Sequence, residues 1–344
     1  MTVARAQIVD PELTPWYHCI SRCVRRAFLC GPGFEHRKDW IERRLEKLAD
    51  TFAVAVAGYA VMDNHLHVLV RLEPERVGDW SDREVVVRWG RLFPPRGADR
   101  KPLQLTKAWI AEKLANAEWV ARARGRLADL GWFMKCLKEP LARLANREDD
   151  CRGAFWESRY KSIALLDEPS LVATCAYIDL NPVAAGVARL PEESTHTSLK
   201  TRVEHCRERG RLDELRQAHA GGAAAIDACR GLEEGLWLCP IDDRRERAAC
   251  RAGLLPGFSL ASYLQLIDWT SRLVRQGKAS VGREVRSLLD RLGTSADRWE
   301  STLQRLFSRR RTTGVAFAFS REPLRAAAAR RGQRHLANRS GCPA

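Results

Sequence analysis

The chain has 344 residues, of which 45% are hydrophobic, so it is long enough to bury a sizeable core and to form two domains. Its net charge of +15 favours a polyanionic partner, and residues 301–344 hold ten arginines against one acidic residue, Glu322. No segment has the apolar length needed to span a membrane, and the 11 cysteines show neither a C-x-x-C pair nor a usual zinc spacing. Since no signal peptide is evident either, we expect a cytoplasmic protein with free thiols and no membrane partner.

The N-terminal part shows the patterns of three strands and one helix. Residues 14–21 have the two-residue period of a strand, and residues 35–51 carry an apolar stripe at helical spacing. Residues 53–62 and 65–71 indicate two further strands, and the dipeptide Asp63-Asn64 between them suits a tight turn. These strands are expected to pair as neighbours in one sheet.

The middle of the chain is less regular. Residues 74–105 predict an irregular, exposed segment. Residues 106–148 predict two helices with a break between Gly125 and Gly131. Residues 155–166 predict one more strand, ahead of a further helix.

Two histidines lie at the centre of an apolar strand, in the triplet His65-Leu66-His67. Alternation along a strand directs both imidazoles to the same face, where they form a pair of ligands for a divalent metal. The simpler interpretation is two histidines that fill a half-buried sheet face. For this triplet alone, the simpler interpretation is preferred.

A second polar pair lies on the helix predicted at residues 168–182, which ends at Asn181-Pro182. Tyr177 and Asn181 are four positions apart, so a phenol and an amide project from the same face of the last turn. Taken singly, Tyr177 is more simply a core aromatic and Asn181 a helix-terminating residue.

Four ordered motifs together resemble the REP-associated tyrosine transposases, a branch of the single-tyrosine HUH transposases. The triplet His65-Leu66-His67 matches the His-hydrophobic-His pattern of that name. The likeness covers roughly residues 13 to 205 and is carried by YHCISRCVRR at 17–26, VMDNHLH at 61–67, FWESRYKS at 155–162 and YIDLNPVAAG at 177–186.

The order of the predicted elements and the resemblance imply the same fold class. Both favour an α+β domain at residues 1–205, with a ferredoxin-like or RRM-like antiparallel sheet and helices packed on one face. Residues 206–344 are expected to form a mostly helical, basic extension, with helices at 259–276 and 281–291 and a joint at Gly221-Gly222.

The resemblance also implies a chemistry. Tyr177 would be the nucleophile that cleaves single-stranded or hairpin DNA at palindromic repeats and keeps a covalent 5′-phosphotyrosine. His65, His67 and Asn181 would bind the metal, and this neutral ligand set suits Mg²⁺ or Mn²⁺ better than a structural zinc ion. The chain has one candidate tyrosine on this helix, so it fits poorly with replication initiators, which use two tyrosines. Histidine-triad nucleotide hydrolases need His-x-His-x-His, and they are disfavoured because position 69 is Leu69.

Other functions stay open at this point. The main alternative is a non-catalytic protein that retains the fold and binds hairpin DNA or RNA, and an RRM-like RNA-binding module is a weaker one. The arginines of residues 301–344 are either a phosphate-binding arm or a disordered basic tail. Whether the protein is a monomer or a homodimer is not predicted.

Overall fold

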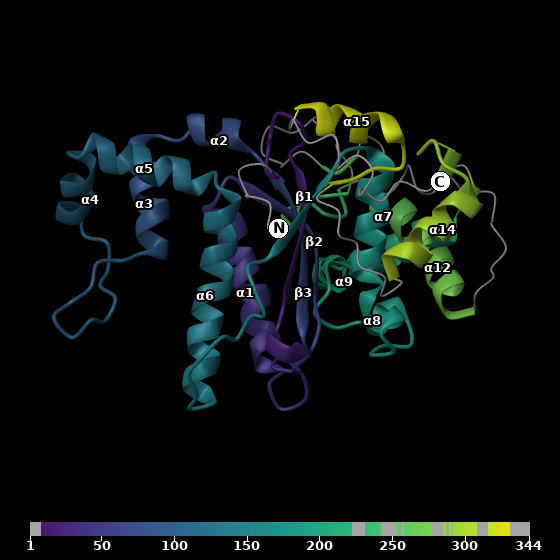
Figure 1. Ribbon diagram of the computed structural model, residues 1–344, viewed down its shortest axis with the longest axis horizontal. Coiled ribbons are helices and arrows are strands. Elements are labelled where there is room, and N and C mark those ends of the chain that lie inside the picture. Colours follow the sequence, from purple (N-terminus) through teal and green to yellow (C-terminus); the bar gives the residue numbers. More distant parts are fainter. Residues whose placement is uncertain are drawn as a thin grey trace.

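A computed structural model describes most of the chain, and its core is one mixed sheet with helices on both faces (Figure 1). The described residues are 8–221, 231–241, 253–255, 258–276, 285–286, 289–290, 292–307 and 316–330. No helix among these residues is long and apolar enough to cross a membrane. The eight cysteines that they include are free thiols.

The sheet has five strands in the order β2-β3-β1-β4-β5. Their bounds are Trp16–Arg22 for β1, Val54–Val61 for β2, His65–Leu72 for β3, Lys161–Leu165 for β4 and Ala316–Phe317 for β5. The first four strands pair antiparallel, as expected, but β5 pairs parallel to β4, so the prediction of a purely antiparallel sheet is wrong. The strand predicted at 155–166 is also shorter, because it begins only at Lys161.

One face of the sheet, called here the α1 face, is covered by α1 (His36–Thr51) and α6 (Leu130–Glu148). Tyr17 of β1 and Val68 of β3 point into this core, together with Leu45 of α1. The predicted helix at 35–51 is confirmed, and its apolar stripe is what packs against the strands.

Four helices project from the α1 face as an arm, at the left of Figure 1. They are α2 (Pro74–Gly78), α3 (Asp82–Leu92), α4 (Lys107–Leu114) and α5 (Ala117–Leu127). The prediction of an irregular segment at 74–105 is therefore wrong in part, and three helices rather than two fill 106–148. Two of the missed starts carry a polar cap: Ser81 and Asn116 accept hydrogen bonds from the backbone N–H three residues ahead.

The opposite face, called here the α7 face, is covered by α7 (Glu168–Asp179), α8 (Asn181–Ala184), α9 (Ser198–Glu208), α12 (Leu260–Gln276) and α14 (Ala296–Phe307). Leu69 of β3 and Ile163 of β4 point into this second core. The prediction of helices on one face only is therefore wrong. The strands carry apolar side chains at both odd and even positions, so each face needs a cover.

The C-terminal region contributes directly to this arrangement. Besides β5, α12 and α14, it forms α10 (Leu212–Ala220) and α15 (Arg321–Arg330), and short 3₁₀ turns lie at Val24–Arg26 and Pro191–Glu193. The helix predicted at 259–276 is confirmed, whereas most of 281–291, Gly222 and the arginines beyond Arg330 lie outside the described residues. The domain boundary at residue 205 stays a prediction.

Candidate active site

Strand pairing gathers several polar side chains on the α7 face. In the antiparallel β1–β3 pair, Arg22 lies opposite His65, and Ile20 lies opposite His67. Because side chains alternate along each strand, His18 and Arg22 share this face with both histidines of the triplet. The predicted direction of His65 and His67 follows from this alternation.

The structure brings together all four residues that the sequence singled out. The rings of His65 and His67 have centroids 4.8 Å apart, and the ring of Tyr177 meets His67 edge-on at 5.3 Å. The side chain of Asn181 lies within hydrogen-bonding reach of both Tyr177 and His65. A phenol, two imidazoles and an amide therefore converge from β3, α7 and the start of α8.

The position of Tyr177 is fixed by a buried carboxylate two residues further along α7. Asp179 accepts hydrogen bonds from Ser198 Oγ at 2.6 Å, from the Leu199 backbone N–H at 2.9 Å and from Tyr263 Oη at 2.6 Å. The donors belong to α9 and α12, so three helices meet at one side chain. This network sets the rotation of α7 and hence the direction of Tyr177.

Replacing Asp179 by alanine is expected to destabilise the protein by about 3 kcal/mol, because buried donors would lose their charged acceptor. Tyr263→Phe removes one of the three bonds, so it should cost about 1 kcal/mol. Urea unfolding followed by circular dichroism measures both changes. An Asp179→Ala variant as stable as the Tyr263→Phe variant would contradict the anchoring role of this carboxylate.

His18 was not predicted to belong to the site, yet it lies at its centre. Its Nε2 is 2.9 Å from Nδ1 of His67, the two rings stack with centroids 5.1 Å apart, and its edge meets the Tyr177 ring at 6.0 Å. The alternation in residues 14–21 and the motif at 17–26 both contained this residue. The missing information was the register between β1 and β3, which no local pattern supplies.

The three imidazoles are neutral in the folded protein. Burial lowers the pKa of His18 to about 3 and that of His65 to about 4, and it holds the pKa of His67 well below its usual range. Nearby positive charge on Arg22 adds to the shifts of His65 and His67. Neutral imidazoles keep the lone pairs that a metal requires.

One atom of the site is well suited to a metal ion. Nε2 of His67 is buried and has no hydrogen-bond partner among the described residues. A buried polar atom without a partner is unusual in a folded protein. His65, His67 and Asn181 therefore fit a divalent cation in the chemistry of their donor atoms.

The tyrosine is held as a phenol. Burial raises the pKa of Tyr177, while the hydrogen bond from Asn181 and the positive charge of Arg22 act in the opposite direction. The ring of Phe307, at the end of α14, lies 5.0 Å from the ring of Tyr177 and covers it. The two groups that favour the phenolate both come from the site itself.

Acid is expected to destabilise the metal-free protein through these histidines. Their folded-state pKa values lie below the ordinary 6.5, so the unfolded chain binds protons that the folded protein does not. The contribution of these histidines to the free energy of unfolding is therefore fully present above pH 6.5. It is lost as the pH falls toward the folded-state pKa values, by about 1.4 kcal/mol per pH unit for each histidine. In urea unfolding with EDTA, His18→Phe should reduce this slope by one histidine's share. An unchanged slope would contradict a neutral, buried His18.

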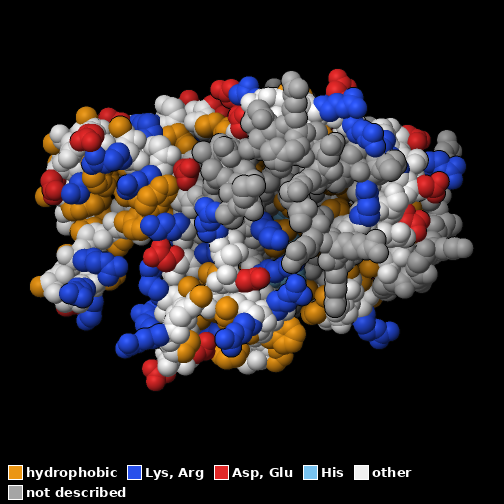
Figure 2. Space-filling model, in the orientation of Figure 1, with side chains coloured by type: hydrophobic (Ala, Val, Ile, Leu, Met, Phe, Trp, Pro, Cys, Tyr) orange, Lys and Arg blue, Asp and Glu red, His pale blue; other side chains and the backbone are white. Residues whose placement is uncertain are grey.

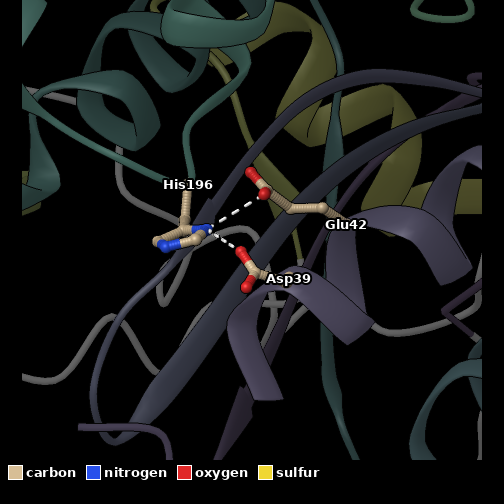
Figure 3. Close-up of side chains that lie close together, drawn as sticks. All are labelled: Asp39, Glu42 and His196. Carbon is tan, nitrogen blue, oxygen red and sulfur yellow. Dashed lines mark hydrogen bonds and ion pairs between the residues drawn. The ribbon is translucent and has the colours of Figure 1, made fainter. Parts of the chain in front are cut away.

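A second group of possible ligands lies at the edge of β2 (Figure 3). Nδ1 of His196 is 2.9 Å from Oε2 of Glu42 and 3.7 Å from Oδ1 of Asp39. Tyr59 also donates a hydrogen bond to Glu42 at 2.8 Å. The three side chains could hold a cation, but they equally form an ion-pair network that ties α1 to the segment before α9.

Comparison with known proteins does not extend this description. No family model matches the chain, and no match is found among curated proteins or among solved structures. The functional interpretation therefore depends on the geometry of the residues themselves.

Proposed function

We propose that the protein is a cytoplasmic, metal-dependent endonuclease and strand transferase for single-stranded DNA, similar to the REP-associated tyrosine transposases. It would act at hairpins or palindromic repeats through a covalent 5′-phosphotyrosine. One observation carries the proposal: the ring of Tyr177 lies against His67, His67 lies beside His65, and the side chain of Asn181 reaches both Tyr177 and His65.

The connectivity of the sheet supports the same proposal. The chain order β1-α1-β2-β3-α6-β4 combines with the spatial order β2-β3-β1-β4, and this combination is compatible with the proposed ferredoxin-like βαββαβ unit. The arm, β5 and the helices of the α7 face would then be additions around this unit. In such a unit the two central strands are β1 and β3, the strands that carry the site.

The proposed reaction needs a nucleophile, neutralised phosphate charge and a stabilised leaving group. The phenolic oxygen of Tyr177 gives up its proton and attacks the phosphorus, the bond to the 3′ oxygen breaks, and that oxygen takes up a proton to become a 3′ hydroxyl. The 5′ phosphate of the DNA stays on the tyrosine. Mg²⁺ or Mn²⁺ held by His65, His67 and Asn181 would polarise the scissile phosphate and stabilise the leaving 3′ oxygen. Arg22 brings positive charge to the same face. Reversal by a new 3′ hydroxyl completes strand transfer without ATP.

The surface where the arm meets α6 supports a nucleic-acid partner. The guanidinium of Arg126 lies 4.4 Å from the ring centre of Trp132, and the ammonium of Lys135 lies 4.5 Å from it. Phe93 packs beside them and is 43% exposed. Figure 2 shows hydrophobic and basic side chains over the arm, with acidic side chains among them. Aromatic rings among cations can stack bases and contact phosphates.

The proposal is tested by incubating the protein and Mn²⁺ with circular single-stranded phage DNA and with hairpin oligonucleotides, including copies of any palindromic repeats that sequencing finds in the DNA beside its gene. We expect DNA that stays attached to the protein on a denaturing gel. The alternative, a non-catalytic protein that binds hairpin DNA or RNA, would retard the nucleic acid on a native gel and give no attached product.

A further inference from the structure

His18 and His67 form a buried imidazole pair whose geometry restricts the proton positions. The ring nitrogens are 2.9 Å apart, and the side chains belong to residues that are 4% and 1% exposed. Two neutral imidazoles at this distance share one proton, so one nitrogen donates and the other accepts. Either Nδ1 of His67 carries the proton and donates it to His18, or His18 donates to a bare Nδ1.

The two arrangements differ in whether Nε2 of His67 carries a proton. If Nδ1 carries the proton, Nε2 keeps a free lone pair. If Nδ1 accepts, Nε2 carries the proton and cannot bind a cation. Nε2 is the atom that is buried without a partner among the described residues, and a buried N–H there would be left unsatisfied. With the proton on Nδ1, His67 has no unsatisfied buried N–H, and a bound cation would occupy the lone pair of Nε2.

We propose that His18 is a positioning residue, which accepts the Nδ1–H of His67 and so keeps Nε2 of His67 free to bind the divalent cation. This inference rests on the proposed function, because it concerns the metal of that same site. The partner of a ligating histidine fixes both its tautomer and its ring orientation. His18 serves this purpose from β1, the strand next to the ligand strand, and its contact with the Tyr177 ring links the ligand to the nucleophile.

Two substitutions separate the acceptor role from simple packing. His18→Phe keeps an aromatic ring and removes the acceptor, whereas His18→Gln offers an amide oxygen near the position of Nε2. Mn²⁺ binding without DNA is measured by electron paramagnetic resonance, with His67→Ala as the reference for loss of the ligand. We expect the Phe variant to bind Mn²⁺ about 10–100-fold more weakly and the Gln variant to stay close to wild type.

Equal Mn²⁺ affinity in wild type and the Phe variant, or equal loss in the folded Phe and Gln variants, would overturn the proposal. Thermal unfolding checks that each variant is folded. Nitrogen-15 NMR of histidine-labelled, metal-free protein gives the tautomer directly: a proton on Nδ1 of His67 supports the proposal, and a proton on Nε2 overturns it. If His67→Ala leaves Mn²⁺ binding unchanged, the metal role of His67 fails instead, and the NMR result still decides the role of His18.

Discussion

Cleavage of single-stranded DNA is expected to fall by about a thousandfold or more when Tyr177 is replaced by phenylalanine, because the substitution removes the oxygen that we propose as the nucleophile. The ring itself would stay against His67 and Phe307, so folding should barely change. Cleavage is measured with end-labelled hairpin oligonucleotides, and binding with a gel shift under the same conditions. The variant should bind DNA about as well as wild type.

The other four tyrosines provide the controls. Tyr17, Tyr59 and Tyr160 belong to the core of the α1 face, on the far side of the sheet from the histidines, and Tyr263 donates to Asp179. Tyr160→Phe is the matched control, because Tyr160 directly precedes β4, the strand before α7. This variant should cleave DNA normally. Normal cleavage by Tyr177→Phe would place the nucleophile elsewhere.

Removal of the metal should abolish cleavage to a similar extent. EDTA is expected to stop wild-type cleavage, and added Mg²⁺ or Mn²⁺ should restore it. His65→Ala and His67→Ala should be inactive with either ion present, since the missing imidazole cannot be replaced by more metal. Asn181→Ala should be milder, because a neutral amide contributes less than an imidazole to a first-row metal site.

The group at the edge of β2 is the natural control for this experiment. His196→Ala removes the imidazole beside Glu42 and Asp39, and it should leave metal-dependent cleavage intact. The reverse pattern, with loss of cleavage in His196→Ala and normal cleavage in His67→Ala, would contradict our proposal. The metal would then lie at the edge of β2 and not at the histidine triplet. Unchanged cleavage in EDTA would remove the metal requirement altogether.

The parts of the site that the sequence predicted depend on short-range periodicity. His65 and His67 share a face because a strand alternates with a period of two, and Tyr177 and Asn181 converge because they are four residues apart near a helix end. These relations need no knowledge of the tertiary fold. Contact between the two pairs was expected only from the family resemblance.

What the sequence did not predict depends on long-range pairing. His18 entered the site through the register of β1 with β3, which is set by residues about fifty positions away. The sheet itself ends in β5, a strand of two residues that no alternation pattern can identify. Two helices of the arm, α2 and α3, were missed for a local reason, because charged residues and nearby prolines concealed short helices such as α3.

The most direct test of the proposed function is to identify the residue that holds the DNA. Wild-type protein is incubated with Mn²⁺ and a cleavable hairpin oligonucleotide, digested with nuclease and protease, and examined by peptide mass spectrometry. We predict a nucleotide joined through its 5′ phosphate to the peptide that contains Tyr177. Cleaved DNA with no nucleotide on Tyr177, or a nucleotide on a different residue, would contradict the proposed mechanism.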